Sequence, residues 1–205
     1  MPTFSRTLLI FARAPIAGRC KTRLMPRYGG RGAAVIHRRL VTSTLRTAAA
    51  TKVDAELWCE PHTGHGFFHA CRRDYDLVLR RQCSGDLGRK MAVAVQKIQS
   101  RSRAVVIVGT DCATLDADDI EQAFLALEKG ADCVIKPAED GGYVLIGARC
   151  PLGLALRKID WSSGRELGQT LSRLRRRGLA VDLLETTWDV DHPKDVVRAR
   201  QKGLL

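Results

Sequence analysis

The sequence predicts an α/β protein, in which a mostly parallel mixed sheet lies between two layers of helices. Short apolar runs typical of buried strands recur along the 205 residues, and segments with helical spacing of apolar side chains separate most of them. A chain with this alternation forms a parallel-rich sheet that helices cover on both faces. The chain also shows no linker, internal repeat or low-complexity stretch. We therefore expect one three-layer α/β/α domain over residues 1–205.

Strands are expected where apolar and β-branched residues form short runs. These runs span residues 7–12, 55–59, 77–81, 104–109, 133–137, 143–147 and 179–184. Only the short segment AEDGG joins the fifth run to the sixth, so we expect these two strands to be antiparallel. Ligands of open α/β sheets lie beyond the carboxyl ends of the strands, so binding residues are expected in the loops that follow strands.

Helices are expected where apolar side chains recur three or four positions apart. The segments are residues 32–50, 87–98, 116–127, 163–177 and 193–201. Asp116, with Asp119 three positions later, is placed to cap the third of these helices. Pro193 favours the first turn of the last helix.

The chain is strongly basic, with a net charge of +12 and an isoelectric point near 9.8. A basic surface is the usual footprint of a nucleic-acid-binding protein. Here, however, the arginines are scattered in pairs and triplets beside apolar helical positions, without the interleaved aromatic side chains on which bases stack. The pattern therefore favours a solvated, arginine-rich surface over nucleic-acid binding.

Cysteine usage and hydropathy predict a cytoplasmic protein. The seven cysteines are odd in number, are scattered and form no Cys-x-x-Cys pair, which indicates reduced thiols. The apolar run at residues 7–12 is too short for the core of a secretory signal, and no segment approaches the length that spans a membrane. We expect no membrane partner, and a homodimer is compatible with the sequence.

The loop FARAPIAGRCKTRL, residues 11–24, follows the first predicted strand and has the composition of a phosphate cradle. Small residues such as Ala12 and Gly18 permit close backbone approach, and Arg13, Lys21 and Arg23 supply cations for a polyphosphate. The loop matches neither the P-loop nor the dinucleotide-binding pattern. The alternative is a basic loop that contacts only solvent.

Asp111 is the first candidate ligand of a divalent cation. It leaves a fully apolar run in the segment VVIVGTDC, residues 105–112. A carboxylate at such a position is costly to bury alone, and it is normally hydrated, used as a helix cap or bound to a metal. Because Asp116 already caps the next helix, Asp111 is free to bind a cation, with a capping or hydrogen-bonding role as the alternative.

The segment WDVDHPKDV, residues 188–196, offers a second carboxylate. If Asp189 and Asp191 leave a strand, they point to opposite faces, so that only one of them faces the site. Asp191 lies at the expected strand exit, directly ahead of the last helix. We therefore expect Asp191 to be the second metal ligand.

Three further segments are less specific. In PAEDGGYVLIG, residues 137–147, Asp140 and Gly141 suit a hairpin turn as well as they suit the rim of a ligand site. GDLGRKM, residues 85–91, is explained by a helix start capped by Asp86, although it lies at the same sheet edge. HTGHGFFHAC, residues 62–71, lacks the ligand spacing of a zinc site and predicts a loop leading into a surface helix.

The motifs FARAPIAGRCKTRL, GDLGRKM, VVIVGTDCATL, EDGGYVLIG and WDVDHPKDV, in this order, resemble the bacterial DUF2064 family of small GT-A-fold transferases. That family is described as glycosyltransferase-like and is similar to the 2-phospho-lactate guanylyltransferases and other nucleotide-diphospho-sugar transferases. The resemblance implies a GT-A (nucleotide-diphospho-sugar transferase) fold. Ala17 and Ala113 stand where the pattern has proline, which affects loop rigidity more than chemistry.

The resemblance also implies roles for residues in the loops after strands. Substrate-binding roles fall on Ala12, Arg13, Gly18, Lys21, Arg23, Leu87, Gly88, Asp140 and Gly141. The members before residue 24 would line the nucleotide phosphates, residues 87 and 88 would approach the base, and residues 140 and 141 would lie near the sugar or acceptor. Asp111 and Asp191 would hold Mg²⁺ or Mn²⁺, and Lys21 and Asp111 would be the catalytic residues.

Two reactions fit such a site. In glycosyl transfer from a nucleotide-diphospho-sugar, cations stabilise the departing diphosphate while a small-molecule acceptor attacks the anomeric carbon. In nucleotidyl transfer, a phosphorylated acceptor attacks a nucleoside triphosphate and pyrophosphate leaves. The family description favours the first, and the charge of Lys21 and Arg23 favours the second. The two aspartates oppose a third alternative, a non-catalytic basic module that binds RNA or a protein partner.

Overall fold

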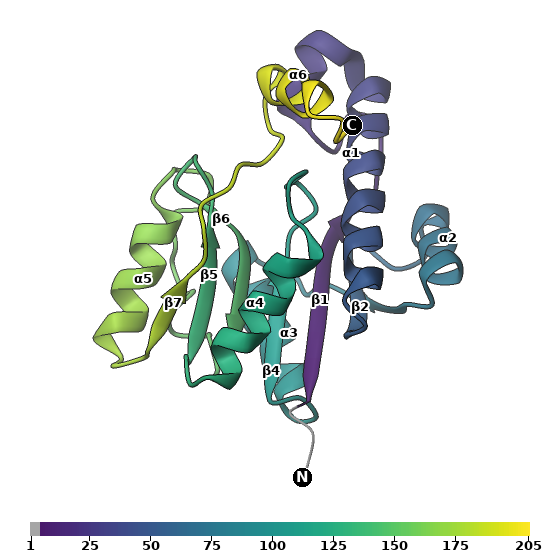
Figure 1. Ribbon diagram of the computed structural model, residues 1–205. Coiled ribbons are helices and arrows are strands. Elements are labelled where there is room, and N and C mark those ends of the chain that lie inside the picture. Colours follow the sequence, from purple (N-terminus) through teal and green to yellow (C-terminus); the bar gives the residue numbers. More distant parts are fainter. Residues whose placement is uncertain (1–4) are drawn as a thin grey trace.

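The computed structural model describes residues 5–205 and confirms the α/β class (Figure 1). The strands are β1 (Arg6–Arg13), β2 (Asp54–Glu60), β3 (Val78–Arg81), β4 (Ala104–Val108), β5 (Cys133–Pro137), β6 (Tyr143–Ala148) and β7 (Val181–Leu183). The helices are α1 (Met25–Ala50), α2 (Gly66–Tyr75), α3 (Leu87–Gln99), α4 (Ala117–Glu128), α5 (Glu166–Arg176) and α6 (Pro193–Gln201), and the short 3-10 helix η1 (Thr22–Leu24) precedes α1. Each predicted strand and helix therefore has a counterpart; most ends shift by up to three residues, but α1 begins seven residues before the predicted start at Gly32.

All seven strands join one sheet in the order β3-β2-β1-β4-β6-β5-β7. Strand β6 pairs antiparallel with both β4 and β5, and the remaining pairs are parallel. The predicted antiparallel pair is thus confirmed. Because β1 and β4 are neighbours at the centre of the sheet, the loops that leave their carboxyl ends lie side by side.

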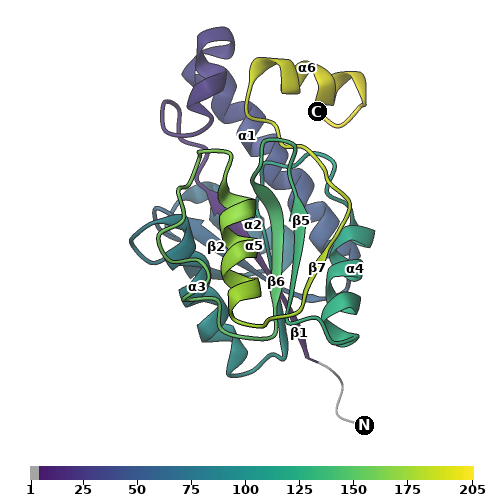
Figure 2. The same cartoon turned by 90° about the vertical axis from the view of Figure 1, so that its left-hand side faces the viewer.

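Side chains alternate across the sheet and divide the core into two halves. On β1, Leu8 and Ile10 pack with α1, α2 and α4, whereas Leu9 and Phe11 pack with α3 and α5. Figures 1 and 2 show the resulting three layers. Helix α4 begins with the predicted capping box, in which the Asp116 carboxylate accepts from the Asp119 amide at 2.9 Å.

A third, smaller core lies above the carboxyl edge of the sheet. There α6 packs against the first half of α1, which begins at Met25 and is interrupted at Gly29, where φ is 65°. Trp188 and Val190 are buried in this core. The packing fixes the segment that precedes α6, and with it the position of Asp191.

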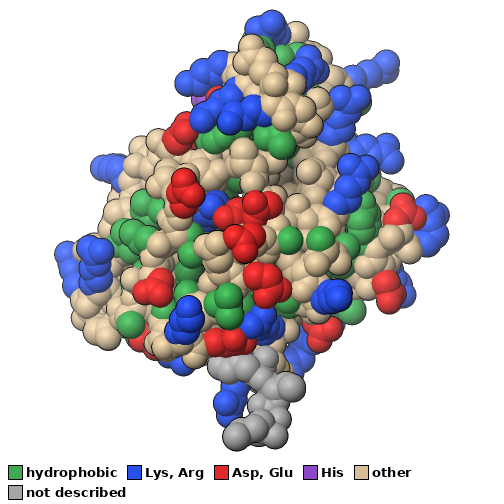
Figure 3. Space-filling model, in the orientation of Figure 1, with side chains coloured by type: hydrophobic (Ala, Val, Ile, Leu, Met, Phe, Trp, Pro, Cys, Tyr) green, Lys and Arg blue, Asp and Glu red, His purple; other side chains and the backbone are tan. Residues whose placement is uncertain are grey.

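Basic side chains are distributed over much of the molecular surface. In the view of Figure 3 they gather over α6 and the start of α1, and lower down they alternate with acidic and uncharged side chains. Among residues 5–205, no helix is both long enough and apolar enough to cross a membrane.

Candidate active site

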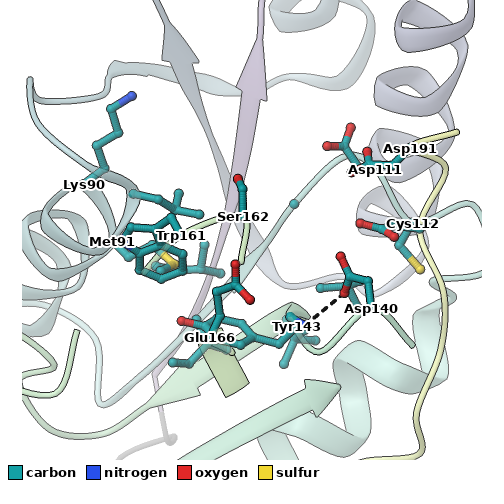
Figure 4. A pocket seen from close by; sticks show the side chains of 18 of the residues that line it. Lys90, Met91, Asp111, Cys112, Asp140, Tyr143, Trp161, Ser162, Glu166 and Asp191 are labelled. Carbon is teal, nitrogen blue, oxygen red and sulfur yellow. Dashed lines mark hydrogen bonds between the residues drawn. The ribbon is translucent and has the colours of Figure 1, made fainter. Parts of the chain in front are cut away.

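A cavity of about 860 Å³ opens at the carboxyl edge of the sheet, within the size range of small-molecule sites. Its walls come from the loops after β1 and β4, the start of α3, the hairpin between β5 and β6, and the segments before α5 and α6. Figure 4 shows its two sides: Asp111, Asp140 and Asp191 lie on one, and Met91, Trp161 and Glu166 lie on the other. The site is therefore where the sheet topology predicts it.

The loop after β1 brings the Lys21 ammonium between two carboxylates. Its Nζ lies 2.9 Å from Oδ1 of Asp111 and 2.8 Å from Oδ1 of Asp191, and only 5% of the Lys21 side chain is exposed. Arg23 contacts the other oxygen of Asp191, Oδ2, at 3.0 Å. Burial opposes the charge of the Lys21 ammonium, but the two carboxylates outweigh it and raise the pKa of Lys21.

Asp111 and Asp191, far apart in the sequence, are brought together by a backbone hydrogen bond. The amide of Val190 donates to the carbonyl of Asp111 at 2.8 Å, so the segment before α6 runs along the loop after β4. Burial of Asp111 favours its neutral form, yet the charge of Lys21 holds the pKa of Asp111 below its ordinary value. Asp111 is therefore an anion in the folded protein.

His37, on α1, belongs to the site although no sequence motif contains it. Its Nε2 lies 2.9 Å from the carbonyl oxygen of Arg13, which can only accept, so Nε2 carries the proton and Nδ1 keeps a lone pair. That Nδ1 is buried without a hydrogen-bond partner and lies 3.8 Å from Oδ1 of Asp111. Burial lowers the pKa of His37 and keeps it neutral near pH 7.

Asp189 and Asp191 both line the cavity, which corrects the expectation that only one of them faces the site. That expectation assumed strand geometry, but residues 188–190 form no strand, because the only ladder contact nearby is an isolated bridge at Thr187. Burial, followed by the neighbouring carboxylates of Asp191 and Asp140, raises the pKa of Asp189 to about 7. Four aspartates thus gather on one side of the cavity.

Replacing Asp189 by Asn is expected to stabilise the metal-free protein above pH 7. In the unfolded chain this carboxyl ionises near its ordinary pKa of 3.8, whereas in the folded protein it keeps its proton to about pH 7. Its contribution to the free energy of unfolding therefore falls as pH rises between these values and is constant above them. The variant should gain about 2 kcal/mol at pH 8, after allowance for partial exposure, and less at pH 5.

Thermal melts of the wild type and Asp189→Asn at pH 5 and pH 8, in EDTA, measure this difference. A gain in Tm that is the same at both pH values would show that the carboxyl is not perturbed in the fold.

The structure distributes the other sequence-predicted residues unevenly. Arg13, Leu87 and Asp140 line the cavity together with Arg23, Asp111 and Asp191. Ala12 does not: its side chain is buried in the core beside α1, because it lies on the same face of β1 as Leu8 and Ile10. Gly18 is exposed, with φ 80° and open space around it.

Gly88 and Gly141 are expected from the sequence to lie beside the ligand, but neither lines the cavity, and both owe their identity to packing. A Cβ at Gly88 would overlap with the carbonyl oxygen of Leu156, and a Cβ at Gly141 would overlap with that of Gly164. Asp140 forms the predicted turn, since its Oδ1 accepts from the Gly142 amide at 2.9 Å. Asp140 also lines the cavity, so the turn and a ligand contact are compatible.

Sequence reasoning missed the opposite wall of the cavity. Tyr143, Trp161, Ser162 and Glu166 lie there, and the Glu166 side chain is buried with Oε1 accepting from the Ser163 amide at 2.8 Å. Trp161 and Ser162 belong to the irregular segment between β6 and α5, which leaves the antiparallel strand β6 at the opposite edge of the sheet. The tryptophan among small residues in DWSSG, residues 160–164, is the one signal that could have drawn notice.

The histidine-rich segment forms a helix start rather than a metal site. His65 caps α2, with its Nδ1 accepting from the Phe67 amide at 3.2 Å, and Cys71 is buried in the core. Within the described range 5–205, no three His, Cys, Asp or Glu side chains already stand close enough to hold a metal.

Comparison with protein families gives a match over the middle of the chain. The family described as "Uncharacterized protein conserved in bacteria (DUF2064)" matches residues 44–163, more than half of the chain. This range includes Asp111 and Asp140 and ends before Asp191, and it begins after the basic loop. No curated protein matches the sequence.

Solved structures confirm the fold. A protein from Desulfovibrio desulfuricans G20, provisionally described as a nucleotide-diphospho-sugar transferase, is 29% identical with a TM-score of 0.81, over 91% of this chain and 82% of that chain. A nucleotidyl transferase from Methanothermobacter thermautotroptrophicus is 15% identical with a TM-score of 0.69, over 98% of each chain. A 4-diphosphocytidyl-2C-methyl-D-erythritol synthase from Anaerococcus prevotii DSM 20548 is 14% identical with a TM-score of 0.63, over 98% of this chain and 96% of that chain. The last two show the fold alone.

Proposed function

This chain belongs to the DUF2064 family, and from that premise we propose that it is a metal-dependent transferase that moves a glycosyl group from a nucleotide-diphospho-sugar to a small-molecule acceptor. The observation that carries the proposal is the convergence of cations and carboxylates at one cavity. Arg13, Lys21 and Arg23 supply positive charge for a diphosphate, and Asp111 and Asp191 supply oxygen ligands for a cation.

The residues present fit Mg²⁺ or Mn²⁺. Carboxylate oxygens are the ligands that these ions prefer, and Asp111 Oδ1 is buried without receiving a hydrogen bond. The lone pair of His37 Nδ1, also unpartnered, is 3.8 Å from that oxygen and suits Mn²⁺ as well. A cation held by Asp111 and Asp191 would stabilise negative charge on the departing diphosphate.

The distribution of charge along the cavity supports glycosyl transfer over nucleotidyl transfer. Among the basic lining residues, Arg13 and Arg23 come from β1 and η1, whereas Lys90, on α3 and on the side of Met91 and Trp161, is paired with Glu60 at 2.8 Å. The opposite wall is formed by the Glu166 carboxylate, by Ser162 and Ser163, and by the rings of Tyr143 and Trp161, whose hydroxyl and indole nitrogen are buried. A neutral, hydroxyl-bearing sugar can donate hydrogen bonds to such a wall, whereas a phosphorylated acceptor would be repelled by its carboxylate.

The positions of the other lining residues suggest which part of the donor or acceptor each one contacts. Arg13 and Arg23 bind the diphosphate, with Gly18 in the same loop, and Leu87 at the start of α3 contacts the base. Asp140, at the tip of the β5–β6 hairpin, lies toward the sugar or the acceptor.

Nucleotidyl transfer is the second candidate, and one observation favours it. The loop after β1 brings Arg13, Lys21 and Arg23 to one end of the cavity, and three cations suit a triphosphate better than a diphosphate. In that reaction the same cations would stabilise the departing pyrophosphate.

A thermal-shift screen of nucleotide-diphospho-sugars and nucleoside triphosphates, with and without Mn²⁺, tests the proposal. A ligand present at 100 times its Kd stabilises the fold by about 2.7 kcal/mol. For a chain of this size that corresponds to a rise in Tm of about 5–10 °C. We expect at least one diphospho-sugar to give this shift, and only with Mn²⁺.

A shift with triphosphates but not with diphospho-sugars would replace glycosyl transfer by nucleotidyl transfer. No shift with any nucleotide, together with binding to generic RNA that weakens steeply with salt, would indicate the non-catalytic basic module instead.

A further inference from the structure

We propose that the Lys21 ammonium and the divalent cation compete for one place between Asp111 and Asp191, so that the cation enters when nucleotide phosphates draw Lys21 away. The inference rests on the proposed function, because it assumes that this pair of aspartates binds a divalent cation. It adds an order of events: the Lys21 ammonium occupies the cation site in the free protein, and it leaves the site when the nucleotide binds.

The first argument is geometric. Lys21 Nζ lies 2.9 Å and 2.8 Å from the Oδ1 atoms of Asp111 and Asp191, so it stands between the two oxygens that a cation would bridge. A Mg²⁺ ion bound to those oxygens would lie roughly 2.0–2.1 Å from each, within the volume that the ammonium fills. An ammonium and a divalent ion in contact would also repel each other. The two cations therefore exclude each other.

The second argument concerns lone pairs that Lys21 leaves unpartnered. The ammonium donates a hydrogen bond to Asp191 but makes none with good geometry to Asp111, whose Oδ1 is buried and receives no hydrogen bond. His37 Nδ1 is likewise buried without a partner, 3.8 Å from that oxygen. A buried acceptor without a donor, such as this nitrogen, is costly in a folded protein, and the Asp111 oxygen has only its ionic contact with Lys21 at 2.9 Å. Both lie next to the place that Lys21 fills, which points to an ion with more coordination capacity than an ammonium.

Arg23 also contacts Asp191, but in a different way from Lys21. It carries the same charge as Lys21 and contacts Asp191, but through the other oxygen, Oδ2, and 51% of its side chain is exposed. Arg23 therefore adds positive charge near the site without filling the place between the carboxylates.

These contacts predict that Mn²⁺ alone binds the free protein weakly. A nucleotide diphosphate offers Lys21 alternative anions, and once the ammonium moves to them both carboxylates are free. Nucleotide and Mn²⁺ should consequently strengthen each other's binding by the same factor. Removing the ammonium should remove the competition and the part of this coupling that the movement of Lys21 supplies.

The test is titration with Mn²⁺ alone, followed by electron paramagnetic resonance of the free ion. We compare the wild type with Lys21→Met and with the matched control Arg23→Met. Lys21→Met removes a unit positive charge from direct contact with the two carboxylates. This variant should therefore bind Mn²⁺ about tenfold more tightly than the wild type, or tighter still. Arg23→Met loses the same charge at an exposed position and should change the affinity by less than about threefold.

Mn²⁺ binding by Lys21→Met that is no tighter than binding by Arg23→Met overturns the inference. If Lys21→Met does not fold without metal, circular dichroism during Mn²⁺ addition replaces the titration: recovery of helical signal supports the inference, and no recovery at saturating Mn²⁺ contradicts it. Because no nucleotide is present, this result is independent of whether the proposed glycosyl donor is correct, which the thermal-shift screen decides.

Discussion

Replacing Gly141 by Ala is expected to lower the free energy of unfolding by about 3 kcal/mol, and to lower Tm by about 6–12 °C. Gly141 has φ 88°, a left-handed conformation that is unfavourable for alanine, and the added Cβ would overlap with the carbonyl oxygen of Gly164. That oxygen belongs to the backbone, so it cannot move aside as a flexible side chain would.

Gly141→Ala should also weaken ligand binding. The Gly141 carbonyl accepts a hydrogen bond from the Leu167 amide at 3.0 Å, which docks the β5–β6 hairpin onto the start of α5. Displacing this contact would move Asp140 on one side and Glu166 on the other, and both line the cavity. The variant should therefore also lose most of the ligand-induced rise in Tm.

Gly153→Ala is the matched control, since a Cβ there meets no atom within 4 Å and the residue has no left-handed φ. Thermal melts and denaturant titrations of the two variants make the comparison. A Gly141→Ala protein as stable as Gly153→Ala would mean that the contact between the hairpin and the segment before α5 is not tight.

The elements of the fold could be predicted from the sequence because their signals are local. Apolar runs mark the strands, Asp116 and Asp119 mark the start of α4, and the short AEDGG segment marks the antiparallel pair. The rule that ligands lie beyond the carboxyl ends of strands then placed Asp111 in the site, because β4 ends just before it.

The arrangement within the site could not be predicted, because it depends on contacts between distant segments. His37 lies in α1, where the spacing of apolar residues predicts which face of the helix is buried but not that His37 lies beside Asp111. The side of the cavity that holds Trp161 and Glu166 is formed by irregular backbone, for which no periodicity exists. Strand alternation failed for Asp189 because packing of Trp188, rather than a sheet ladder, fixes that segment.

Lys21 is the clearest example of a residue whose contacts could not be predicted from the local sequence. Its sequence context indicates a phosphate-binding cation, and nothing local shows that its ammonium is buried between two carboxylates, one from the loop after β4 and one from the segment before α6. This interaction also connects the two predicted ligand sets, the cations for phosphate and the carboxylates for metal. A change to either set should therefore alter the other.

Replacing Asp111 by Asn is expected to abolish the dependence of nucleotide binding on Mn²⁺, the second of the two largest effects. The change removes an anionic ligand of the proposed cation and leaves a neutral amide, which binds a divalent ion far more weakly. Loss of the charge that offsets the departing diphosphate should lower kcat by about 100-fold to 1,000-fold. Asp116→Asn is the matched control, because it removes the same charge at a helix cap where Asn serves as well as Asp.

The measurement that tests the central claim most directly is the Kd of a nucleotide diphosphate, with and without Mn²⁺, for the wild type, Asp111→Asn and Asp116→Asn. If the cation and the nucleotide share this cavity, Mn²⁺ tightens nucleotide binding by the wild type and by Asp116→Asn, but not by Asp111→Asn. Equal enhancement by Mn²⁺ in all three proteins would contradict the assignment of Asp111 as a metal ligand and the site built around it.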